Sequence, residues 1–393
     1  MRSPALAVAA SLLCAGRGAA QLPSLLPAGS YLQDVYYPKL FYTGREGLTG
    51  GLFLSLQAPL RYADYDQPPP YRASITLDGQ ISTSGSRQIG LDARAPLLWD
   101  GWRGNFTLAS ERRARESYFG IGNGAAFDAA NQAGQEFFYR SLNTRSYVRG
   151  ELQRRVAGGL RVLAGFHAQR SRIATLAPVS QLATDSAAGV DPTLGRTASD
   201  VSVRLGLVFD TRDDEVAPSH GVLLEAIRGV ADSSVTGDAT YTRTTVSARV
   251  YVPAHPRLII AARIVGQSMT GRPTLGSYYL IEASDRPFEG IGGPTSHRGL
   301  LDHRLLGPDK LLANLDLRYT LYEIPTLARV SLLAFVDAGR VFPAGGFSLT
   351  TQDLKVGAGG GLVLKFLRAG VLGFTLGSGP DGIVIDAHTG WSF

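Results

Sequence analysis

Long stretches of this sequence alternate apolar and polar residues with a period of two. In the segment LLANLDLRYTLY at residues 311–322, one side is apolar, with four leucines, an alanine and a tyrosine, while the other carries Asn314, Asp316 and Arg318. Successive side chains of a β-strand point in opposite directions, so this alternation gives a strand one apolar face and one polar face. The same pattern recurs in ASITLDGQIS at 73–82 and in VSVRLGLVFD at 201–210. The chain is therefore predicted to be all-β.

The alternating segments are long for a soluble β-protein. Strands of soluble sandwiches are commonly about five or six residues long, whereas about ten residues are needed to cross an outer membrane at a tilt. The polar faces carry arginine, aspartate, glycine and serine but little lysine, which is typical of a water-filled or plugged lumen. We therefore predict a transmembrane antiparallel β-barrel whose apolar face meets lipid, with a soluble β-sandwich as the alternative.

Sixteen candidate strands can be counted along the chain, and they form a single domain. An even number returns both ends of an antiparallel barrel to the periplasmic side. The strands are expected at about 34–43, 47–58, 72–83, 87–96, 101–112, 135–156, 159–173, 199–211, 221–232, 239–254, 257–268, 310–323, 328–342, 353–366, 369–378 and 382–393. Short turns, expected in the periplasm, alternate with long outer connections at about 113–134, 174–198 and 269–309.

The first twenty residues have the pattern of a cleaved export signal. Arg2 supplies a positive charge, an apolar run follows from Ala5 to Cys14, and small residues precede the expected cleavage after Ala20. We therefore expect a signal peptide at 1–20, a short periplasmic segment at 21–33 and the barrel at 34–393. The only cysteine lies in the signal, so the mature chain would have neither a disulfide nor a thiolate metal site.

Composition and motifs exclude several function classes. The formal net charge is +6, but the arginines occur singly along the alternating segments rather than in one basic patch, so nucleic acid is not an expected partner. Neither a Gly-x-Ser-x-Gly elbow nor a His-Glu-x-x-His helix occurs. Four of the six histidines, His167, His297, His303 and His388, lie singly rather than in a cluster. We therefore predict no enzyme, no catalytic residue, no cofactor and no metal site.

Several motifs lie in register over residues 199–393. They are GLVFDTRDDEVAPSHG at 206–221, SHRGL at 296–300, NLDLR at 314–318, FVDAGRVF at 335–342 and a final strand that ends in Trp391 and Phe393. In order and spacing, this set resembles the BamA and TamA superfamily of outer-membrane proteins. The first half of the chain matches the family only in the spacing of its predicted strands and in YFGIGN at 118–123.

The resemblance implies roles for particular residues. It implies a strand–turn–strand signature at Asp210, Thr211, Arg212, Asp213, Pro218 and Gly221. It implies an inward-folded lid loop between the eleventh and twelfth strands, with motif residues Gly292, Gly293, His297, Arg298, Gly299 and Leu300. It implies an insertion signal at Trp391 and Phe393, read by the barrel-assembly machinery of the host and carried on the outward face of the last strand. In this lid, His297 replaces the family's valine and Leu300 replaces its phenylalanine or tyrosine.

The lid arginine needs a partner. A guanidinium enclosed in a lumen needs a carboxylate, ideally a bidentate one. The alternation over residues 328–342 turns Asp337 inward, and Asp337 stands where the family holds its lid arginine. We therefore predict that Arg298 pairs with Asp337 and that Gly299 lets the backbone approach the wall; the alternative is a solvated Arg298.

Two functions are compatible with these features. Members of the family that insert or export proteins carry periplasmic POTRA domains, for which residues 21–33 leave no room, so we expect a barrel-only member. The first function is protein or lipid handling at the outer membrane, through the lumen or a weak seam between the first and last strands, with a separate periplasmic subunit as a candidate partner. The second is a passive, weakly anion-selective pore. Its lumen would be lined by inward-pointing arginines: Arg94, Arg103, Arg145, Arg149, Arg161 and Arg204.

Overall fold

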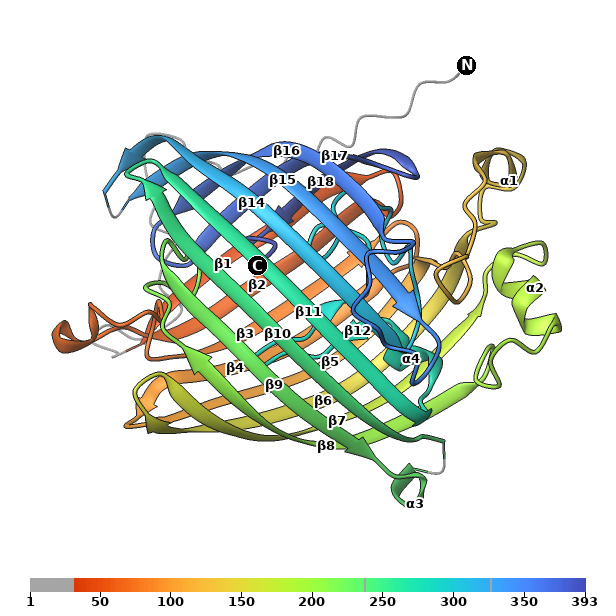
Figure 1. The fold of residues 1–393 in the computed structure, drawn as a ribbon, viewed down its shortest axis with the longest axis horizontal. Helices are drawn as coiled ribbons and strands as arrows, with labels where there is room; N and C mark the ends of the chain where they lie inside the picture. The colour runs from red at the N-terminus through yellow and green to blue at the C-terminus, as the bar shows by residue number, and fades with distance from the viewer. Residues whose placement is uncertain (1–31, 237, 326) are drawn as a thin grey trace.

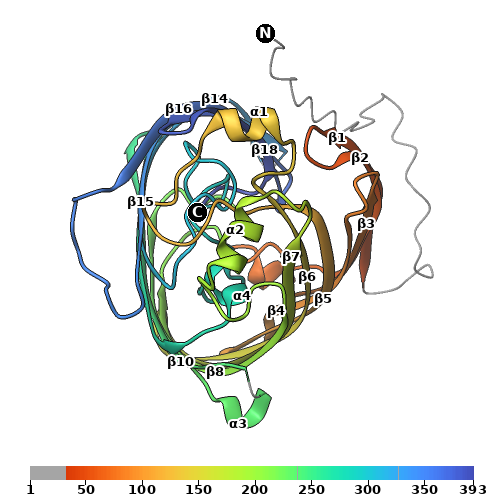
Figure 2. The same cartoon turned by 90° about the vertical axis from the view of Figure 1, so that its right-hand side faces the viewer.

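Sixteen strands form one antiparallel sheet in the computed structural model, which describes residues 32–236, 238–325 and 327–393. They are β1 (Gln33–Thr43), β2 (Gly47–Ala58), β3 (Ala73–Ser82), β4 (Arg87–Trp99), β5 (Trp102–Ser117), β6 (Arg140–Ala157), β7 (Leu160–Thr175), β8 (Thr197–Asp210), β9 (Gly221–Ala231), β10 (Thr240–His255), β11 (Leu258–Arg272), β14 (Asp309–Ile324), β15 (Ala328–Phe342), β16 (Lys355–Phe366), β17 (Gly370–Gly379) and β18 (Gly382–Thr389). The strands pair in sequence order and curl into a barrel (Figures 1 and 2). The predicted fold class and strand count are confirmed. The predicted signal peptide and most of the segment that follows it lie outside the described residues.

The barrel is inverted relative to a soluble protein. On β8, Leu205 is 66% exposed on the outer face, whereas its neighbour Arg204 is 1% exposed on the inner face. Exposing many large apolar side chains to water would cost about 25 cal/mol for each Å² of apolar surface, whereas lipid accepts them. This distribution excludes the soluble sandwich. None of the helices within the described ranges is long and apolar enough to cross a membrane.

The connection between β11 and β14 folds into the barrel. This segment, residues 273–308, is called the plug loop here; it contains α4 (Leu275–Tyr278) and a small two-stranded sheet of β12 (Leu280–Ile281) and β13 (Phe288–Glu289). Figure 2 looks into the end of the barrel that carries α1 (Ala129–Gly134) and α2 (Gln181–Ala187) and shows α4 within the ring of strands. Apolar side chains of the plug loop pack on wall residues in one buried cluster: Ile281, Ile291, Leu300 and Leu305 against Val265, Leu312 and Val341. The predicted inward fold is confirmed.

The connection between β8 and β9, residues 211–220, reaches into the opposite end of the barrel. Glu215 pairs with Arg103 of β5, and its amide donates to Pro68 in the β2–β3 connection, which also holds the short helix η1 (Tyr62–Asp64). Asp214 pairs with Lys365 of β16. The lumen is therefore filled from both ends. The remaining helix, α3 (Ser233–Thr236), lies in the β9–β10 connection.

Four predicted strand boundaries are wrong by four or five residues. β6 begins at Arg140 rather than near residue 135, and β11 ends at Arg272 rather than near residue 268. β5 continues to Ser117 instead of ending near residue 112, because its ladder with β6 resumes after a register shift between Arg113 and Glu116. The following long connection therefore occupies 118–139. The last strand ends at Thr389 rather than at residue 393, because Gly390 has a φ of +85° and redirects the chain.

The chain after Gly390 turns into the lumen. Phe393 is buried against Tyr251 and Ala261, and Trp391 packs against a cluster that includes Phe335. The expectation that Trp391 and Phe393 lie on the outward face of the last strand is wrong, because alternation cannot continue past a residue that leaves the ladder.

Candidate lid and lumen site

Arg298 is fully enclosed and paired with two carboxylates. Its Nε and Nη2 donate to the two oxygens of Asp337 at 2.9 and 2.7 Å, and its backbone amide donates to Asp337 at 2.7 Å. Nη2 also donates to Asp316 at 2.6 Å, and all three side chains are 0% exposed. The guanidinium carbon lies 4.0 Å from the ring centroid of Phe335. The structure therefore brings Arg298 and Asp337 together in the bidentate geometry that favours arginine over lysine.

Neighbouring side chains extend this contact into a network. Asn314 of β14 donates to Asp337 and to the carbonyl of Ser296, at 2.7 and 2.6 Å. Arg263 of β11 donates to Asn314 at 2.9 Å and to the carbonyl of Thr295 at 2.9 Å. Three neighbouring strands of the wall, β11, β14 and β15, therefore hold one short stretch of the plug loop.

The C-terminal residues join the same network. Arg318 donates to Asp316 at 2.9 Å and to the carbonyl of Phe393 at 2.9 Å, and it stacks 4.1 Å from the ring centroid of Trp391. The motif NLDLR on β14 thus contributes Asn314, Asp316 and Arg318 to a single polar layer. This layer ties the plug loop to the end of the chain, which sequence reasoning did not predict.

Gly299 allows the plug loop to touch the wall. A Cβ atom placed on Gly299 would lie 2.7 Å from the Cα of Gly357 in β16 and 2.9 Å from the carbonyl oxygen of Ser378 in β17. Both partners are backbone atoms, which cannot move aside as the end of a side chain can. A larger residue at position 299 would therefore push the loop away from the wall.

We expect Gly299→Val to loosen the plug loop by about 1 to 3 kcal/mol, the usual range for overpacking a close contact. Limited proteolysis should then cut within residues 285–310 faster than in the wild type. Gly50→Val on β2 is the matched control, since a Cβ there meets nothing within 4 Å. Equal protection of the plug loop in both variants would show that the close approach has no role.

The remaining residues of the lid motif also suit the position of the plug loop against the wall. Gly292 and Gly293 have φ values of +119° and +94°, which side chains other than glycine rarely adopt. Nε2 of His297 lies 2.9 Å from the carbonyl oxygen of Lys355, and Leu300 is 1% exposed within the apolar cluster. His297 and Leu300, the two residues that depart from the family motif, therefore contact groups of matching polarity. The imidazole faces a carbonyl oxygen and the leucine packs among apolar side chains.

Residues 282–289 of the plug loop, called the acidic arm here, carry carboxylates that face arginines on the barrel strands. Glu282 accepts from Arg149 of β6 and Arg204 of β8 at 2.8 Å each and lies 3.5 Å from Arg243 of β10. Burial alone would raise the pKa of the Glu282 carboxyl, but the three guanidiniums hold that pKa well below its usual range. Glu282 is therefore an anion whose charge is compensated by the barrel wall.

Two more carboxylates extend this acidic arm. Asp285 accepts from Arg94 of β4 at 3.2 Å and from Asn105 of β5 at 2.5 Å. Glu289 accepts from Arg113 at 2.6 Å. Of the inward arginines predicted to line a pore, Arg94, Arg149 and Arg204 thus pair with the plug loop.

The remaining predicted pore arginines are also paired. Arg103 contacts Glu215, Arg145 contacts Glu111 at 3.0 Å, and Arg161 lies 3.6 Å from Asp210. The wall arginines are therefore largely neutralised, which weakens the case for an open anion pore.

The strand–turn–strand signature forms its own hydrogen-bonded turn. Asp210 accepts from Nε and Nη2 of Arg212 at 3.0 Å each, and Asp213 accepts from the amides of Ser219 and His220 at 2.9 and 3.1 Å. The amide of Thr211 donates to Val222 at 2.9 Å. The remaining two signature residues close the turn: Pro218 lines a small cavity at its end, and Gly221 has a φ of +100° beside the Thr211 carbonyl.

Comparisons with known proteins agree with this architecture. A family model for the Omp85 superfamily domain matches residues 73–366. No curated protein matches the sequence. Among solved structures, the chain is similar to BamA from Haemophilus ducreyi lacking POTRA domains 1–3, at 15% identity, covering 91% of this chain and 68% of that one, with a TM-score of 0.53.

Two further similar structures share the barrel. They are CdiB from Escherichia coli (15% identity, 93% of this chain and 62% of that one, TM-score 0.56) and CdiB from Acinetobacter baumannii (14% identity, 92% and 59%, TM-score 0.51). At these identities the likeness concerns the fold. The chain spans less than two thirds of either CdiB.

Proposed function

Because the chain belongs to the Omp85 superfamily and is an integral barrel of the outer membrane, we propose that it handles proteins or lipids at that membrane behind a movable plug loop. Within the superfamily's assembly and translocation class, the geometry favours a protein client. The proposal requires the plug loop to leave its seat and the barrel to offer a client an edge for pairing. No enzymatic step is part of it.

The observation that carries the proposal is the seam of the barrel. The hydrogen-bonded order of the sheet begins at β1 and ends at β18, and no ladder joins these two strands within the described residues. Within the described residues β18 pairs only with β17, and the outer edge of such a strand presents backbone donors and acceptors, which in lipid are costly to leave unpaired. An incoming strand of a client can satisfy them by strand addition. The seam is therefore the proposed site of client contact.

Reconstitution tests this function. Liposomes that contain the barrel should fold a urea-denatured eight-stranded outer-membrane barrel faster than liposomes that contain an equal mass of a porin. The shift of the folded client in unheated electrophoresis measures the rate. An unchanged rate would contradict the assembly function.

A passive pore is the competing function, and conductance in planar bilayers separates the two. Since the plug loop fills the lumen and neutralises wall arginines, we expect a mostly closed barrel with brief openings. A large, stable and anion-selective conductance would instead support the passive pore.

The proposed orientation places the long connections outside the cell. Arg196 is exposed in the β7–β8 connection, whereas Arg212 is buried at the opposite end of the barrel. Trypsin added to intact cells should therefore cut after Arg196 and leave Arg212 intact, as read by mass spectrometry of the fragments. Cleavage at Arg212 in intact cells would reverse the orientation.

Two partners complete the proposal. Trp391 and Phe393 follow the last strand rather than belonging to its ladder, so before folding is complete they are available as an insertion signal for the host's barrel-assembly machinery. We also propose a separate periplasmic subunit that presents clients to the seam. Affinity purification from solubilised outer membranes would identify it.

A further inference from the structure

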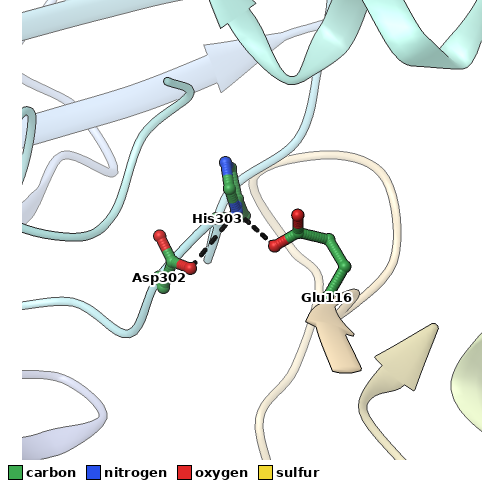
Figure 3. Close-up of side chains that lie close together, drawn as sticks. All are labelled: Glu116, Asp302 and His303. Carbon is green, nitrogen blue, oxygen red and sulfur yellow. Dashed lines mark ion pairs between the residues drawn. The ribbon is translucent and has the colours of Figure 1, made fainter. Parts of the chain in front are cut away.

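Three potential ligands meet where the plug loop contacts β5. Nδ1 of His303 lies 3.1 Å from Oε1 of Glu116 and 3.5 Å from Oδ2 of Asp302, and the ligand atoms of all three residues lie within 4.8 Å of one another (Figure 3). His303 and Glu116 have side chains that are 1% exposed, and that of Asp302 is 26% exposed. Beyond the proposed function, we propose that these three residues bind a divalent transition-metal ion, with Zn²⁺ the best fit, that fastens the plug loop to the wall.

The histidine is set up as a ligand. Nε2 of His303 lies 3.1 Å from Oε2 of Glu289, whereas Nδ1 makes no hydrogen bond of acceptable geometry within the described residues. Metal-bound histidines commonly donate their second ring nitrogen to a carboxylate, which fixes the tautomer and aims the first nitrogen at the metal. Glu289 would serve that purpose here, leaving the Nδ1 lone pair directed between Glu116 and Asp302.

Outer residues orient the two carboxylates. Arg113 donates to Oε2 of Glu116 at 3.1 Å, which leaves Oε1 turned towards His303. Arg45 from the β1–β2 turn pairs with Oδ2 of Asp302, the same oxygen that faces Nδ1 of His303, so this oxygen would have to accept from Arg45 and bind the metal with its second lone pair. The position of Asp302 also depends on Gly293, where a Cβ would come within 2.8 Å of Oδ1. Each ligand is thus held by a contact outside the group of three.

The backbone at His303 is unusual. Its φ is +53°, in the left-handed region that residues other than glycine rarely occupy. Such conformations persist where the surroundings over-determine them, and they gather at functional sites. Here the conformation directs the imidazole back towards β5.

The spacing and ligand types favour zinc over calcium or magnesium. Two ligands about 2.0 to 2.2 Å from a tetrahedral zinc lie roughly 3.3 to 3.6 Å apart, close to the 3.1 and 3.5 Å separations around Nδ1. Calcium and magnesium prefer sites made only of oxygen. One imidazole and two carboxylates suit Zn²⁺ and leave its fourth position open to water.

A proton on Nδ1 is the competing occupant of the same space. Although burial lowers it, the pKa of the His303 imidazole is raised well above its usual value by Asp302, Glu116 and Glu289. An imidazolium would also hold the plug loop to β5, as an ion pair instead of a metal site. A direct binding measurement must therefore distinguish the two.

The test uses the full barrel, purified in detergent without a histidine tag and stripped with EDTA. Isothermal titration with Zn²⁺ should show one tight site per chain, and Co²⁺ should give the visible absorption of a low-symmetry, four- or five-coordinate site. His303→Gln and Glu116→Gln should each weaken Zn²⁺ binding at least 100-fold. Glu289→Gln, which removes only the positioning contact, should weaken it about 10- to 100-fold. His167→Gln, a buried lumen histidine outside the group, is the matched control and should bind as the wild type does.

Zn²⁺ should also slow proteolysis of residues 285–310 in the wild type, and EDTA should reverse this protection. Absence of a stoichiometric site in the wild type, or Zn²⁺ binding that His303→Gln leaves unchanged, would overturn the proposal in favour of the imidazolium. If Glu116→Gln fails to fold, the Co²⁺ spectrum of the wild type against folded His303→Gln decides. The outcome is independent of the client-folding assay, so either proposal can fail alone.

Discussion

Replacing Arg298 with alanine should release the plug loop while the barrel itself remains folded. The change leaves Asp337 buried with only Asn314 and one backbone amide as donors. Removing one partner of a buried ion pair typically costs about 3 to 5 kcal/mol. The strand ladders do not depend on this pair, so the loss should appear as faster proteolysis between residues 285 and 310 and as greater conductance.

A double-mutant cycle tests whether the pair acts as a unit. Asp337→Ala should be milder than Arg298→Ala, because Asp316 stays 2.6 Å from the guanidinium. The double variant should be less perturbed than the sum of the single variants, since neither charge is then left alone. Arg329→Ala is the control: its pair with Glu323 is partly exposed, at 27% and 41%, and should be worth about 1 kcal/mol or less. Strict additivity with an unchanged plug loop would contradict the lid assignment.

Replacing Glu282 with glutamine should have the second large effect. The change leaves Arg149, Arg204 and Arg243 facing one another with Glu151 as the nearest carboxylate, 3.7 and 3.3 Å from the first two. Like charges buried together are strongly unfavourable, so the acidic arm should leave its seat at a cost of about 3 to 5 kcal/mol. Planar bilayers should then show frequent openings, and their reversal potential in a salt gradient should indicate selectivity for anions over cations.

The control for this variant is Glu323→Gln, whose carboxylate is exposed beside Arg329. It should leave conductance unchanged. Openings of Glu282→Gln that prefer cations would mean that the three arginines do not line the freed path.

Acidification gives an independent check on the same residue. Because the folded pKa of Glu282 is depressed, its contribution to plug seating is fully present above the ordinary glutamate pKa of about 4.3 and is lost only as pH falls through the lower folded value. The pKa of Asp285 is also held below its usual value by Arg94, against the opposing effect of burial. Lowering the pH from 7 to 5 should therefore leave the conductance closed.

Local alternation made the strands predictable. The period-two pattern located all sixteen strands because each long strand separates lipid-facing from lumen-facing residues at every step. The same pattern predicts that Asp337 points into the lumen, and the resemblance to the family indicates Arg298 as its partner. Alternation failed beyond Gly390, where a positive φ ends the ladder and carries Trp391 and Phe393 inside.

Contacts across the lumen were not predictable from sequence. Glu282 lies in a loop without a motif, and its arginine partners come from β6, β8 and β10. His303 has no sequence signal that links it to Glu116, because Glu116 lies on β5, far away in the chain. Such pairs depend on the radius of the barrel and the path of the plug loop, and neither quantity has a local sequence signal.

Hydrogen–deuterium exchange of the barrel in liposomes tests the central claim most directly, namely that the plug loop is seated in the resting lumen. The amide of Arg298 donates to Asp337 and that of Leu305 to Ile291, at 2.7 and 3.0 Å. Peptides covering residues 290–306 should therefore exchange as slowly as those from β14, while the exposed segment 129–136 exchanges rapidly. Exchange of 290–306 within seconds, matching that exposed segment, would show that the loop lies in water and would contradict the account.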